Sequence, residues 1–340
     1  MTTPLSWRAR TVETWVHAVL RRTGLPDEDA ALAAAALTDA DRRGLAGHGL
    51  ARLAAYVARL EAGDMNPVPR LRCVEDGGVL SIDADLGLGQ VVGIRAIDAA
   101  LARLDGRAAQ IFLLRRAGHL GALGHYVRRA AEAGKVALLA QVSQPVMAPP
   151  GATRAAIGNN PVAFAAPMPD GPPLVVDLSL SLVARGNVLL AARDGAPIPP
   201  GWAIGRDGSP TTDPAEALLG AMLPMGDYKG LALAMMVQVL AGSLTGSTPR
   251  TAPGQGAAAE VGAFGIVADP ARIIGRAEFD AHMADWTGHY LAATGAHGRI
   301  PGRAEPAGRI TPSANVLPEL TALGARFGLP FPTGAERDES

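Results

Sequence analysis

Hydrophobic residues recur at helical spacing through the first part of the chain, and this pattern predicts three helices. The predicted helices span residues 11–22, 27–43 and 48–61. In the third, apolar positions repeat every three or four residues and form one face of the helix. These positions are Leu50, Leu53, Val57 and Leu60. The segment GDMNPVPR ends the pattern, so we expect the chain to begin with a helical unit.

From about residue 71 the pattern changes to short apolar runs between helical stretches. It predicts strands at 79–85, 109–114, 135–142, 162–167, 173–178 and 188–193. It predicts further helices at 90–104, 121–133, 229–242, 276–293 and 315–327. Residues 229–242 are almost continuously apolar, which predicts a buried helix. Residues 195–227 are expected to form a long ordered loop and 246–262 a mobile segment, so the pattern indicates a mixed α/β body.

Composition excludes several classes of protein. The chain has 340 residues, 48% of them hydrophobic, which is too many for a disordered protein. The net charge of −1 gives no general attraction to nucleic acid or to an anionic membrane. Cys73 is the single cysteine, which excludes an intrachain disulfide and an all-cysteine metal site. The start, MTTPLSWRARTVETW, lacks a signal-peptide core, and no apolar run has membrane-spanning length, so we expect a cytoplasmic globular protein.

A glycine-rich segment, GLGQVVG at 87–93, follows a predicted strand and opens a predicted helix. It is close to a dinucleotide-binding fingerprint, in which glycines let the backbone approach a pyrophosphate. Its spacing is GxGxxxG rather than GxGxxG, and no acidic residue clearly ends a second strand about 20 residues later. A tight turn into a helix is therefore favoured over a Rossmann domain.

Two places in the sequence carry candidate acid–base chemistry. His48 and Arg52 lie four residues apart, so a helix places them on one face. There the histidine could exchange a proton and the arginine could clamp a carboxylate, although a surface histidine beside a solvated arginine has the same spacing. His119 lies between a predicted strand and helix with glycines on both sides, where a ligand could come close to a general acid or base.

Other motifs are absent from the sequence. The seven histidines form no HxxxH or HExxH pair, so no metal site is predicted. Neither a GxSxG elbow nor a GxxxxGK[ST] phosphate loop occurs, which disfavours a hydrolase and a P-loop nucleotidase. Only two lysines, Lys135 and Lys229, occur among many arginines, and Lys229 lies in the glycine-flanked segment MGDYKG.

Several segments in fixed order resemble one known family. They are RRGLAGHGLARLAAY at 42–56, AGHLGALGHY at 117–126, PPGATRAAIGNNPVAFAAP at 149–167, VVDLSLSLVARGNV at 175–188, IPPGWAIGRDGSPTTDP at 198–214, LPMGDYKGLALAMMVQVLAG at 223–242 and RIPG at 299–302. Across about residues 8–330 the chain resembles the malate/L-lactate dehydrogenase family of NAD(P)-dependent oxidoreductases. That family includes ureidoglycolate and sulfolactate dehydrogenases and cyclic imino acid reductases.

The resemblance implies an α/β, non-Rossmann NAD(P)-binding fold with a large, mostly antiparallel sheet and a helical dimerisation part made from both chain ends. It implies four parts: a helical, dimerising 1–70, a linking 71–110, an NAD(P)-binding 111–297, and a segment 298–340 that returns to the helical part. It also implies a homodimer or a multiple of dimers.

By the same resemblance, the cofactor is NAD or NADP and the other ligand is a small carboxylic acid. The implied cofactor contacts are His119, Leu120, Gly121, Ala122, Leu123, Ser143, Asn159, Asp177, Leu178, Ser179, Lys229, Pro301, Gly302 and Arg303. His119 would be the proton donor or acceptor, with His48 in reserve, and Arg52 would orient the substrate carboxylate. The implied reaction moves a hydride between the nicotinamide and C2 of a 2-hydroxy or 2-oxo acid.

Two positions depart from parts of the family. Many members have Ser where this chain has Gly47, and the cyclic imino acid reductases have Asp where it has Asn187. Those reductases use that Ser, a His and that Asp as a relay, so two of three relay groups are missing here. A cyclic imino acid reductase and a non-catalytic nucleotide-binding relative remain as alternatives to the 2-hydroxy acid dehydrogenase.

Overall fold

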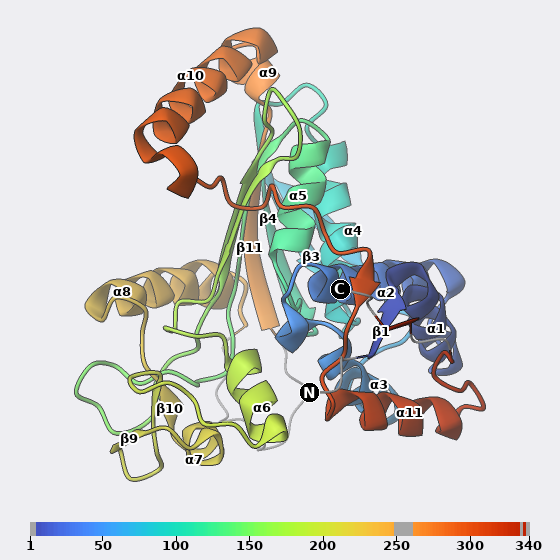
Figure 1. Ribbon diagram of the computed structural model, residues 1–340. Coiled ribbons are helices and arrows are strands. Elements are labelled where there is room, and N and C mark those ends of the chain that lie inside the picture. The colour runs from blue at the N-terminus through green and yellow to red at the C-terminus, as the bar shows by residue number, and fades with distance from the viewer. Residues whose placement is uncertain (1–4, 248–260, 334–335, 338–340) are drawn as a thin grey trace.

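The computed structural model describes residues 5–247 and 261–333 and the backbone of 336–337. Most of the segment expected to be mobile, 246–262, lies outside these residues. Helices that begin and end the chain lie together at one side of the molecule (Figure 1). They are α1 (Ala9–Arg22), α2 (Asp27–Arg42), α3 (Leu53–Glu61) and α11 (Val316–Arg326). The three predicted N-terminal helices are confirmed, although residues 46–52 form two short 3-10 helices before α3.

Both chain ends share one hydrophobic core. Val16, Leu37 and Leu53 from the N-terminal helices pack in the same cluster as Leu320 of α11. Phe331 makes edge-to-face contacts with Trp7 and Trp15, with ring centroids 5.2 and 4.8 Å apart. Strand β1 (Leu5–Arg8) pairs antiparallel with β12 (Arg309–Ile310) and β13 (Glu336–Arg337). The helical unit is therefore built from both ends of the chain.

A large mixed sheet forms the body of the molecule. In order across the described sheet, its strands are β2 (Arg72–Asp76), β3 (Val79–Asp83), β4 (Ala109–Ala117), β11 (Val261–Ala268), β5 (Val136–Gln141), β6 (Val162–Ala166) and β7 (Leu174–Leu178). Neighbouring strands are antiparallel, except that β3 and β4 are parallel. The expectation of a mostly antiparallel sheet is confirmed.

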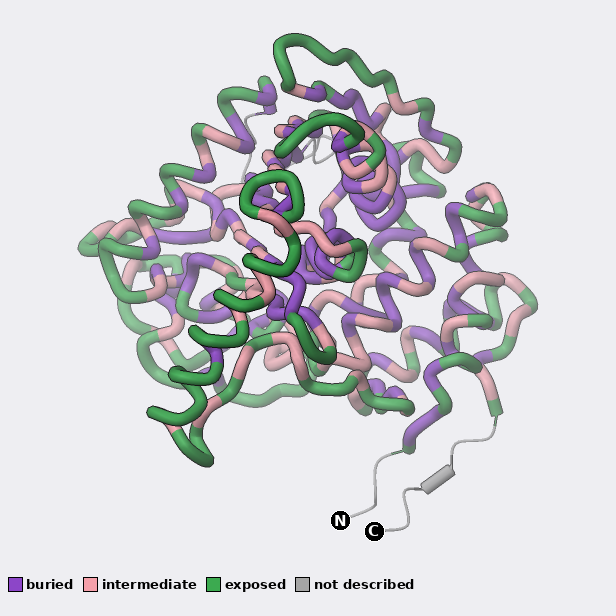
Figure 2. Tube along the Cα trace, turned by 90° about the horizontal axis from the view of Figure 1, so that it is seen from above, coloured by how far each residue is buried: buried purple, intermediate pink, exposed green. Residues whose placement is uncertain are grey.

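Helices cover both faces of this sheet. Helices α4 (Gly89–Ala102) and α5 (Gly124–Glu132) pack on one face, in the cluster that contains Phe112 and Leu139. Helix α8 (Tyr228–Val237) and the π-helical turn 238–243 pack on the other face, in the cluster that contains Ala140. Successive residues of a strand point to opposite faces of the sheet. Leu139 therefore faces the layer of α4 and α5, and Ala140 faces the layer of α8. Figure 2 shows that most helices have buried positions on the side that faces the interior and exposed positions on the opposite side.

Two sequence predictions are wrong in the segment between β7 and α8. Residues 188–193 belong to helix α6 (Arg185–Asp194), because Val188 packs inward while most of its neighbours remain half-exposed. Residues 195–227 are not a simple loop. They contain a small sheet of β8 (Ala203–Ile204), β9 (Pro210–Thr211) and β10 (Ala221–Met222), with α7 (Pro214–Leu219).

Two helices differ in extent or burial from the sequence prediction. The helix expected at 121–133 begins only at Gly124, so residues 121–123 remain in a loop. Helix α8 is apolar but not buried, because only one side of it contacts the sheet. Leu233, Met235 and Met236 on its other side are 40–53% exposed. Beyond it, α9 (Pro270–Ile273), α10 (Arg276–Thr294) and the 3-10 turn 295–297 project from the end of the sheet (Figure 1).

The central strand β11 escaped sequence analysis because glycines interrupt its apolar pattern. Gly265 lies opposite Phe112 of β4. A Cβ atom at Gly265 would come within 2.1 Å of the Phe112 ring, so the ring occupies the space that a side chain would need. Glycine has a low strand propensity, yet only glycine fits beneath this ring.

We predict that Gly265→Ala destabilises the protein by about 1–3 kcal/mol, because the methyl group forces the Phe112 ring to move. Urea denaturation followed by circular dichroism measures this change. Gly288→Ala in α10 is the matched control, since a Cβ atom there meets nothing within 4 Å. Equal stability of the two variants would contradict the packing argument.

Candidate active site

One cavity of about 330 Å³ gathers most of the predicted chemistry. It lies where the helical unit meets the loops after β4 and β5 and the start of α6. Its lining residues are His48, Arg52, Ala55, Tyr56, Arg59, His119, Ser143, Gln144, Val146, Asn159, Arg185, Gly186, Leu189 and Val261. The structure thus brings together both candidate proton carriers, the candidate carboxylate clamp and, besides His119, two further predicted cofactor contacts, Ser143 and Asn159.

His119 is held by a buried hydrogen-bond chain from two helices. Its Nδ1 lies 2.8 Å from the Tyr56 hydroxyl of α3. The same hydroxyl accepts a bond of 3.2 Å from Nε2 of Gln90 in α4. The hydroxyl hydrogen is then free to point at Nδ1, which leaves Nε2 of His119 for a ligand. Gln90 Oε1 is buried without a partner, so a half-turn of the amide would let it accept the hydroxyl hydrogen instead.

His48 lies beside His119 in the same cavity. The two rings are nearly parallel, with centroids 6.0 Å apart. Burial, and then the nearby Arg52 guanidinium, lowers the pKa of His48 to about 4. Burial, followed by the charges of Arg52, His48 and Arg59, holds the pKa of His119 well below its usual value. Both imidazoles are therefore neutral near pH 7 in the empty cavity.

Helix α3 presents one face to the cavity. Tyr56 and Arg59 of α3 and Arg52, the last residue of the 3-10 turn before it, stand four and three residues apart, which places them along one side of the helix. Nε of Arg52 donates to the carbonyl of Gly47 over 2.8 Å, which fixes the guanidinium beside the two histidines. The apolar face of the same helix, with Leu53 and Val57, is buried in the helical core.

Close backbone contacts at glycines bring the parts of the site together. A Cβ atom at Gly89 would lie 2.1 Å from the carbonyl oxygen of His119, so the start of α4 directly supports the His119 loop. The other glycines of GLGQVVG also pack against protein, with Gly87 against Val92 and Gly93 against Tyr126. The segment is thus a tight turn into α4, as the spacing favoured.

The contact between Gly47 and Gly186 joins α6 to the turn that carries His48. A Cβ atom at Gly47 would lie 2.9 Å from the backbone of Gly186. A serine at position 47 would therefore displace α6. Asn187, at the position where the cyclic imino acid reductases have Asp, is exposed. The Ser–His–Asp relay of the imino acid reductases has no counterpart in this arrangement.

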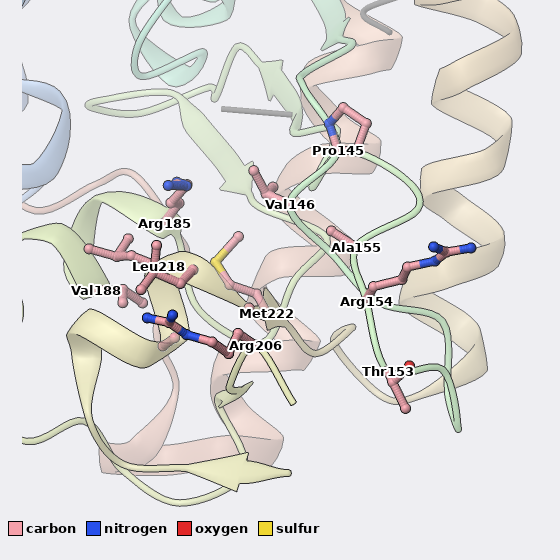
Figure 3. A pocket seen from close by; sticks show the side chains of 13 residues that line it. Pro145, Val146, Thr153, Arg154, Ala155, Arg185, Val188, Arg206, Leu218 and Met222 are labelled. Atoms are coloured by element: carbon pink, nitrogen blue, oxygen red, sulfur yellow. The ribbon is translucent and has the colours of Figure 1, made fainter. Parts of the chain in front are cut away.

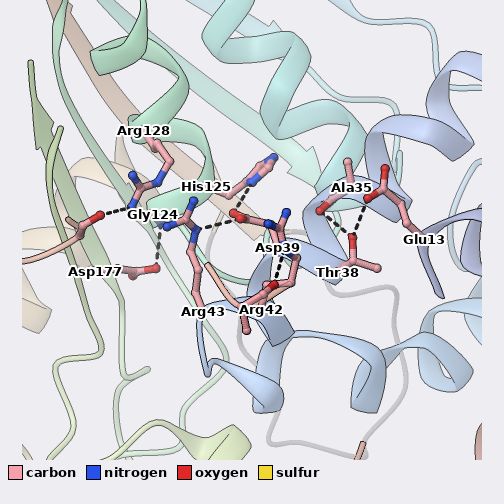
Figure 4. Close-up of polar contacts among 12 residues, drawn as sticks. Glu13, Ala35, Thr38, Asp39, Arg42, Arg43, Gly124, His125, Arg128 and Asp177 are labelled. Atoms are coloured by element: carbon pink, nitrogen blue, oxygen red, sulfur yellow. Dashed lines mark hydrogen bonds and ion pairs between the residues drawn. The ribbon is translucent and has the colours of Figure 1, made fainter. Parts of the chain in front are cut away.

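The loop after β4 offers free backbone donors. Amides of Leu120, Gly121, Ala122 and Leu123 donate to no acceptor in the described part of the chain. The loop ends at α5, where the Gly124 amide donates to Oδ2 of Asp177 over 2.8 Å (Figure 4). Burial raises the pKa of Asp177 to about 6. Free amides at the start of a helix suit an anionic group such as a phosphate.

The other predicted cofactor residues fall into two groups. Ser143 Oγ donates to Asn159 Oδ1 over 2.8 Å at the cavity, and the Leu180 amide after Leu178 and Ser179 donates to the Asn159 carbonyl over 2.9 Å. Lys229 is exposed on α8 and has no partner among the described residues. In contrast, the run Pro301, Gly302 and Arg303 lies along β7, outside the cavity lining. There Pro301 accepts from Val175 over 2.9 Å, and Arg303 donates to the Asp170 carbonyl over 2.7 Å.

Sequence reasoning missed five polar residues of the site, among them Gln144 of the loop after β5. Tyr56 and Arg59 had a usable signal, since they continue the helical face that begins at Arg52. Gln90 and Arg185 had none, because only the packing of α4 and α6 brings them to the site.

A second cavity of about 290 Å³ adjoins the first and shares Val146 and Arg185 with it. Figure 3 shows Arg154, Arg185 and Arg206 around this space. Arg206 is paired with Glu216 at 3.2 Å. Within residues 5–247 and 261–333, no group of three or more His, Cys, Asp or Glu side chains could hold a metal ion. None of the described helices is long and apolar enough to cross a membrane.

Comparisons with known proteins agree with this geometry. Residues 7–315 match the family described as malate/L-lactate dehydrogenase. The chain is 44% identical over 240 residues to (2R)-3-sulfolactate dehydrogenase (NADP(+)) of Chromohalobacter salexigens, covering 70% of this chain and 72% of that one. It is 36% identical over 331 residues to a Δ1-pyrroline-2-carboxylate reductase of Ancylobacter novellus, covering 92% and 96%. The crystal structure of a dehydrogenase from Sinorhizobium meliloti superposes with a TM-score of 0.86 at 32% identity, covering 94% of this chain and 98% of that one. The chain therefore belongs to the malate/L-lactate dehydrogenase family.

Proposed function

We propose that this protein is an NAD(P)-dependent oxidoreductase in which His119 moves the proton while a hydride passes between the nicotinamide and C2 of a small 2-hydroxy or 2-oxo acid. The observation that carries the proposal is the position of His119. Nδ1 of this residue is engaged by Tyr56 and its ring lines a cavity that also holds Arg52. An imidazole that is neutral near pH 7, beside a carboxylate clamp, suits a reaction that needs one proton at an oxygen next to a carboxylate.

The residues present fit a nicotinamide dinucleotide. The free backbone amides at 120–123 can donate hydrogen bonds to phosphate oxygens. Ser143, Asn159 and Asp177 provide further donors and acceptors nearby. Lys229 adds an exposed cation. When bound, NAD or NADP donates or accepts the hydride. We infer that this site is not of the Rossmann type, because the GLGQVVG glycines pack against protein and the sheet is mostly antiparallel.

The side chains of this protein position the acid and handle the proton. Arg52 binds the C1 carboxylate and presents C2 to His119. In reduction, protonated Nε2 of His119 donates to the C2 oxygen; in oxidation, neutral Nε2 takes that proton back. Tyr56 stays bonded to Nδ1 in both states, because Nδ1 carries a hydrogen in each and donates it to the hydroxyl, while the hydroxyl donates to Oε1 of the turned Gln90 amide.

The geometry favours a C=O substrate over a cyclic imine. The relay that some imino acid reductases use needs side chains at positions 47 and 187. Gly47 has none and is closed against Gly186, and Asn187 is exposed. The proposed chemistry needs neither position, since it uses His119, Tyr56 and Arg52.

We also propose that the protein is a homodimer that covers α8 and α10. Large apolar side chains are exposed on both helices: Leu233, Met235, Met236, Trp286, Tyr290 and Leu291. Exposed apolar area of this kind usually marks an interface. Because the helical unit of the chain ends buries most of its apolar residues, this interface differs from the one the resemblance implied.

Light scattering of the purified protein is expected to give about twice the 34.8 kDa mass of one chain, because a second copy buries these helices. Met235→Glu with Trp286→Glu should shift the mass toward a monomer. A monomer in the unsubstituted protein would contradict the proposal.

For His119→Ala we predict a loss in kcat of about 10²-fold or more, because the proton then has no positioned carrier. The measurement is absorbance of the reduced nicotinamide at saturating 2-oxo acid. His282→Ala, an exposed histidine on α10, is the matched control and should keep wild-type kcat. Fluorescence of bound NAD(P)H checks that the variant still folds and binds. A kcat near wild type for His119→Ala would remove this residue from the mechanism.

The lowered histidine pKa values predict an unusual pH profile for oxidation of the 2-hydroxy acid. The reaction needs neutral His119, and a lowered pKa keeps the neutral form populated below the ordinary histidine value of about 6.5. We expect kcat/KM to stay level as the pH falls from about 8 to about 6, and to decline only below that range. A decline centred at or above about 6.5 would show that the empty cavity does not depress this pKa.

A further inference from the structure

The second cavity, of about 290 Å³, lies directly beside the candidate active site and has mostly apolar walls. Val146, Val188, Ala217 and Met222 belong to one hydrophobic cluster, and Leu218 packs against them. These side chains surround the space instead of filling it (Figure 3). An apolar cavity of about 150 Å³ is already large enough to hold a benzene molecule. The second cavity therefore has room for an apolar group as large as an aromatic ring, and the proposed mechanism does not use this room.

The two cavities share one wall. Val146 and Arg185 line both of them, so these side chains separate the active-site cavity from the second cavity. The start of α6 continues the same wall, since Leu189 lines the active-site cavity and Val188 lines the second one. A group attached to a ligand in the active site therefore reaches the second cavity by passing between Val146 and Arg185.

The Arg185 guanidinium is the polar group of this shared wall, and it is free to receive a ligand. Its side chain makes no hydrogen bond or ion pair with any described residue. Burial, and then the charge of Arg52, lowers the pKa of Arg185, so the guanidinium is partly withdrawn from water. The other arginines of the second cavity differ, because Arg206 is paired with Glu216 at 3.2 Å and Arg154 is exposed. Arg185 can thus lie against an incoming group without giving up an interaction with a described residue.

An aromatic ring satisfies both features of this space. Its apolar surface packs against the aliphatic walls and against the sulfur of Met222, a favourable contact for a ring. A guanidinium stacks on the face of an aromatic ring, which compensates a half-buried cation for part of its lost hydration. An aliphatic group would match the walls but not the cation, whereas a second anionic group would match the cation but not the walls.

We propose that the second cavity binds an aryl group on C3 of the substrate, with the ring between the apolar walls and its face on the Arg185 guanidinium. The substrate is then an aryl-substituted 2-hydroxy or 2-oxo acid of the phenylpyruvate type. Its C1 carboxylate binds Arg52, its C2 lies beside His119, and its C3 leads between Val146 and Arg185. This inference rests on the proposed function and specifies the side group, which that function leaves open.

The first test compares phenylpyruvate, 4-methyl-2-oxopentanoate, pyruvate and oxaloacetate as acceptors with NADH or NADPH. We expect kcat/KM for phenylpyruvate to exceed that for pyruvate by about 30-fold or more, because a single methylene in an apolar pocket already changes this quantity by about 10-fold or more. The value for 4-methyl-2-oxopentanoate should fall between them, since its side group enters the cavity but cannot stack.

The outcomes separate this inference from the proposed function. Equal kcat/KM for phenylpyruvate and pyruvate, or a higher value for oxaloacetate than for phenylpyruvate, would overturn the aryl subsite and leave the proposed function standing. Failure to reduce any 2-oxo acid would instead overturn the proposed function.

A variant that fills the second cavity tests its role. Ala155 lines the second cavity but not the active-site cavity. Ala155→Trp should lower the phenylpyruvate-to-pyruvate ratio of kcat/KM by about 10-fold or more, because the indole takes the place of the ligand ring. Ala156→Trp is the matched control, since Ala156 is exposed and lines neither cavity, and it should leave the ratio unchanged. An unaltered ratio in Ala155→Trp would overturn the assignment.

A second variant tests the contact with the guanidinium. Arg185→Lys keeps the charge but removes the planar face, so it should lower the ratio of kcat/KM for phenylpyruvate to that for 4-methyl-2-oxopentanoate by about 3-fold or more. A merely structural role of Arg185 would affect both acceptors alike. Arg22→Lys, at an exposed arginine that ends α1, is the matched control. An unchanged ratio in Arg185→Lys would contradict the stacking.

Equilibrium binding gives a readout without turnover. 3-Phenyllactate should bind the protein–NAD(P)H complex more tightly than lactate does, as followed by nicotinamide fluorescence, and lactate should compete with it. Ala155→Trp should remove this difference in affinity. Equal affinities in the unsubstituted protein, or binding of 3-phenyllactate that lactate does not displace, would contradict the inference, since the second result would show a site separate from the substrate.

Discussion

The site depends on backbone contacts that only glycine permits. Gly89 lets the start of α4 touch the carbonyl of His119, and the Gly47–Gly186 contact sets α6 against the turn that carries His48. These contacts draw the sheet, the helical unit and the α6 segment around one cavity. Larger residues at these glycines would move His119 and Arg185 apart even if every side chain of the site were kept. The geometry of the candidate active site is therefore set by main-chain packing, which supports its side chains.

The burial and the charges of the cavity determine which protonation state of its histidines is favoured. Burial, and then the charge of Arg52, keeps both imidazoles neutral in the empty cavity, which suits removal of a proton from a hydroxy acid. An incoming anion offsets the arginine charge and makes protonation of His119 easier, which suits the reverse reaction. Tyr56 and Gln90 accommodate either state, because Nδ1 of His119 donates to the hydroxyl in both and the hydroxyl donates to the turned Gln90 amide. Binding of an anionic ligand and protonation of His119 are therefore linked. In the proposed mechanism, one cavity thus supports both directions of the reaction.

The elements that the sequence predicted correctly are those that depend on local hydrophobic spacing. The N-terminal helices and five of the seven strands of the large sheet followed from hydrophobic spacing, and spacing and flanking glycines marked His48, Arg52 and His119 as candidates. Strand β11 did not, since Gly265 is required by the Phe112 ring of another strand. The run 188–193 was misread because an apolar stretch fits a strand or a half-buried helix equally well. Gln90 and Arg185 reach the site only through tertiary packing, so no window of sequence could mark them.

The central claim is that a hydride passes to C2 of a 2-oxo acid in this cavity. The most direct measurement is isotope transfer. The protein would be incubated with oxaloacetate or pyruvate and with NADH or NADPH that carries deuterium at C4 of the nicotinamide, and the product analysed by mass spectrometry and NMR. The account predicts one deuterium at C2 of the hydroxy acid product. Oxidation of the nicotinamide without deuterium at C2, or no product from any acceptor that carries a 2-oxo acid group, would contradict it.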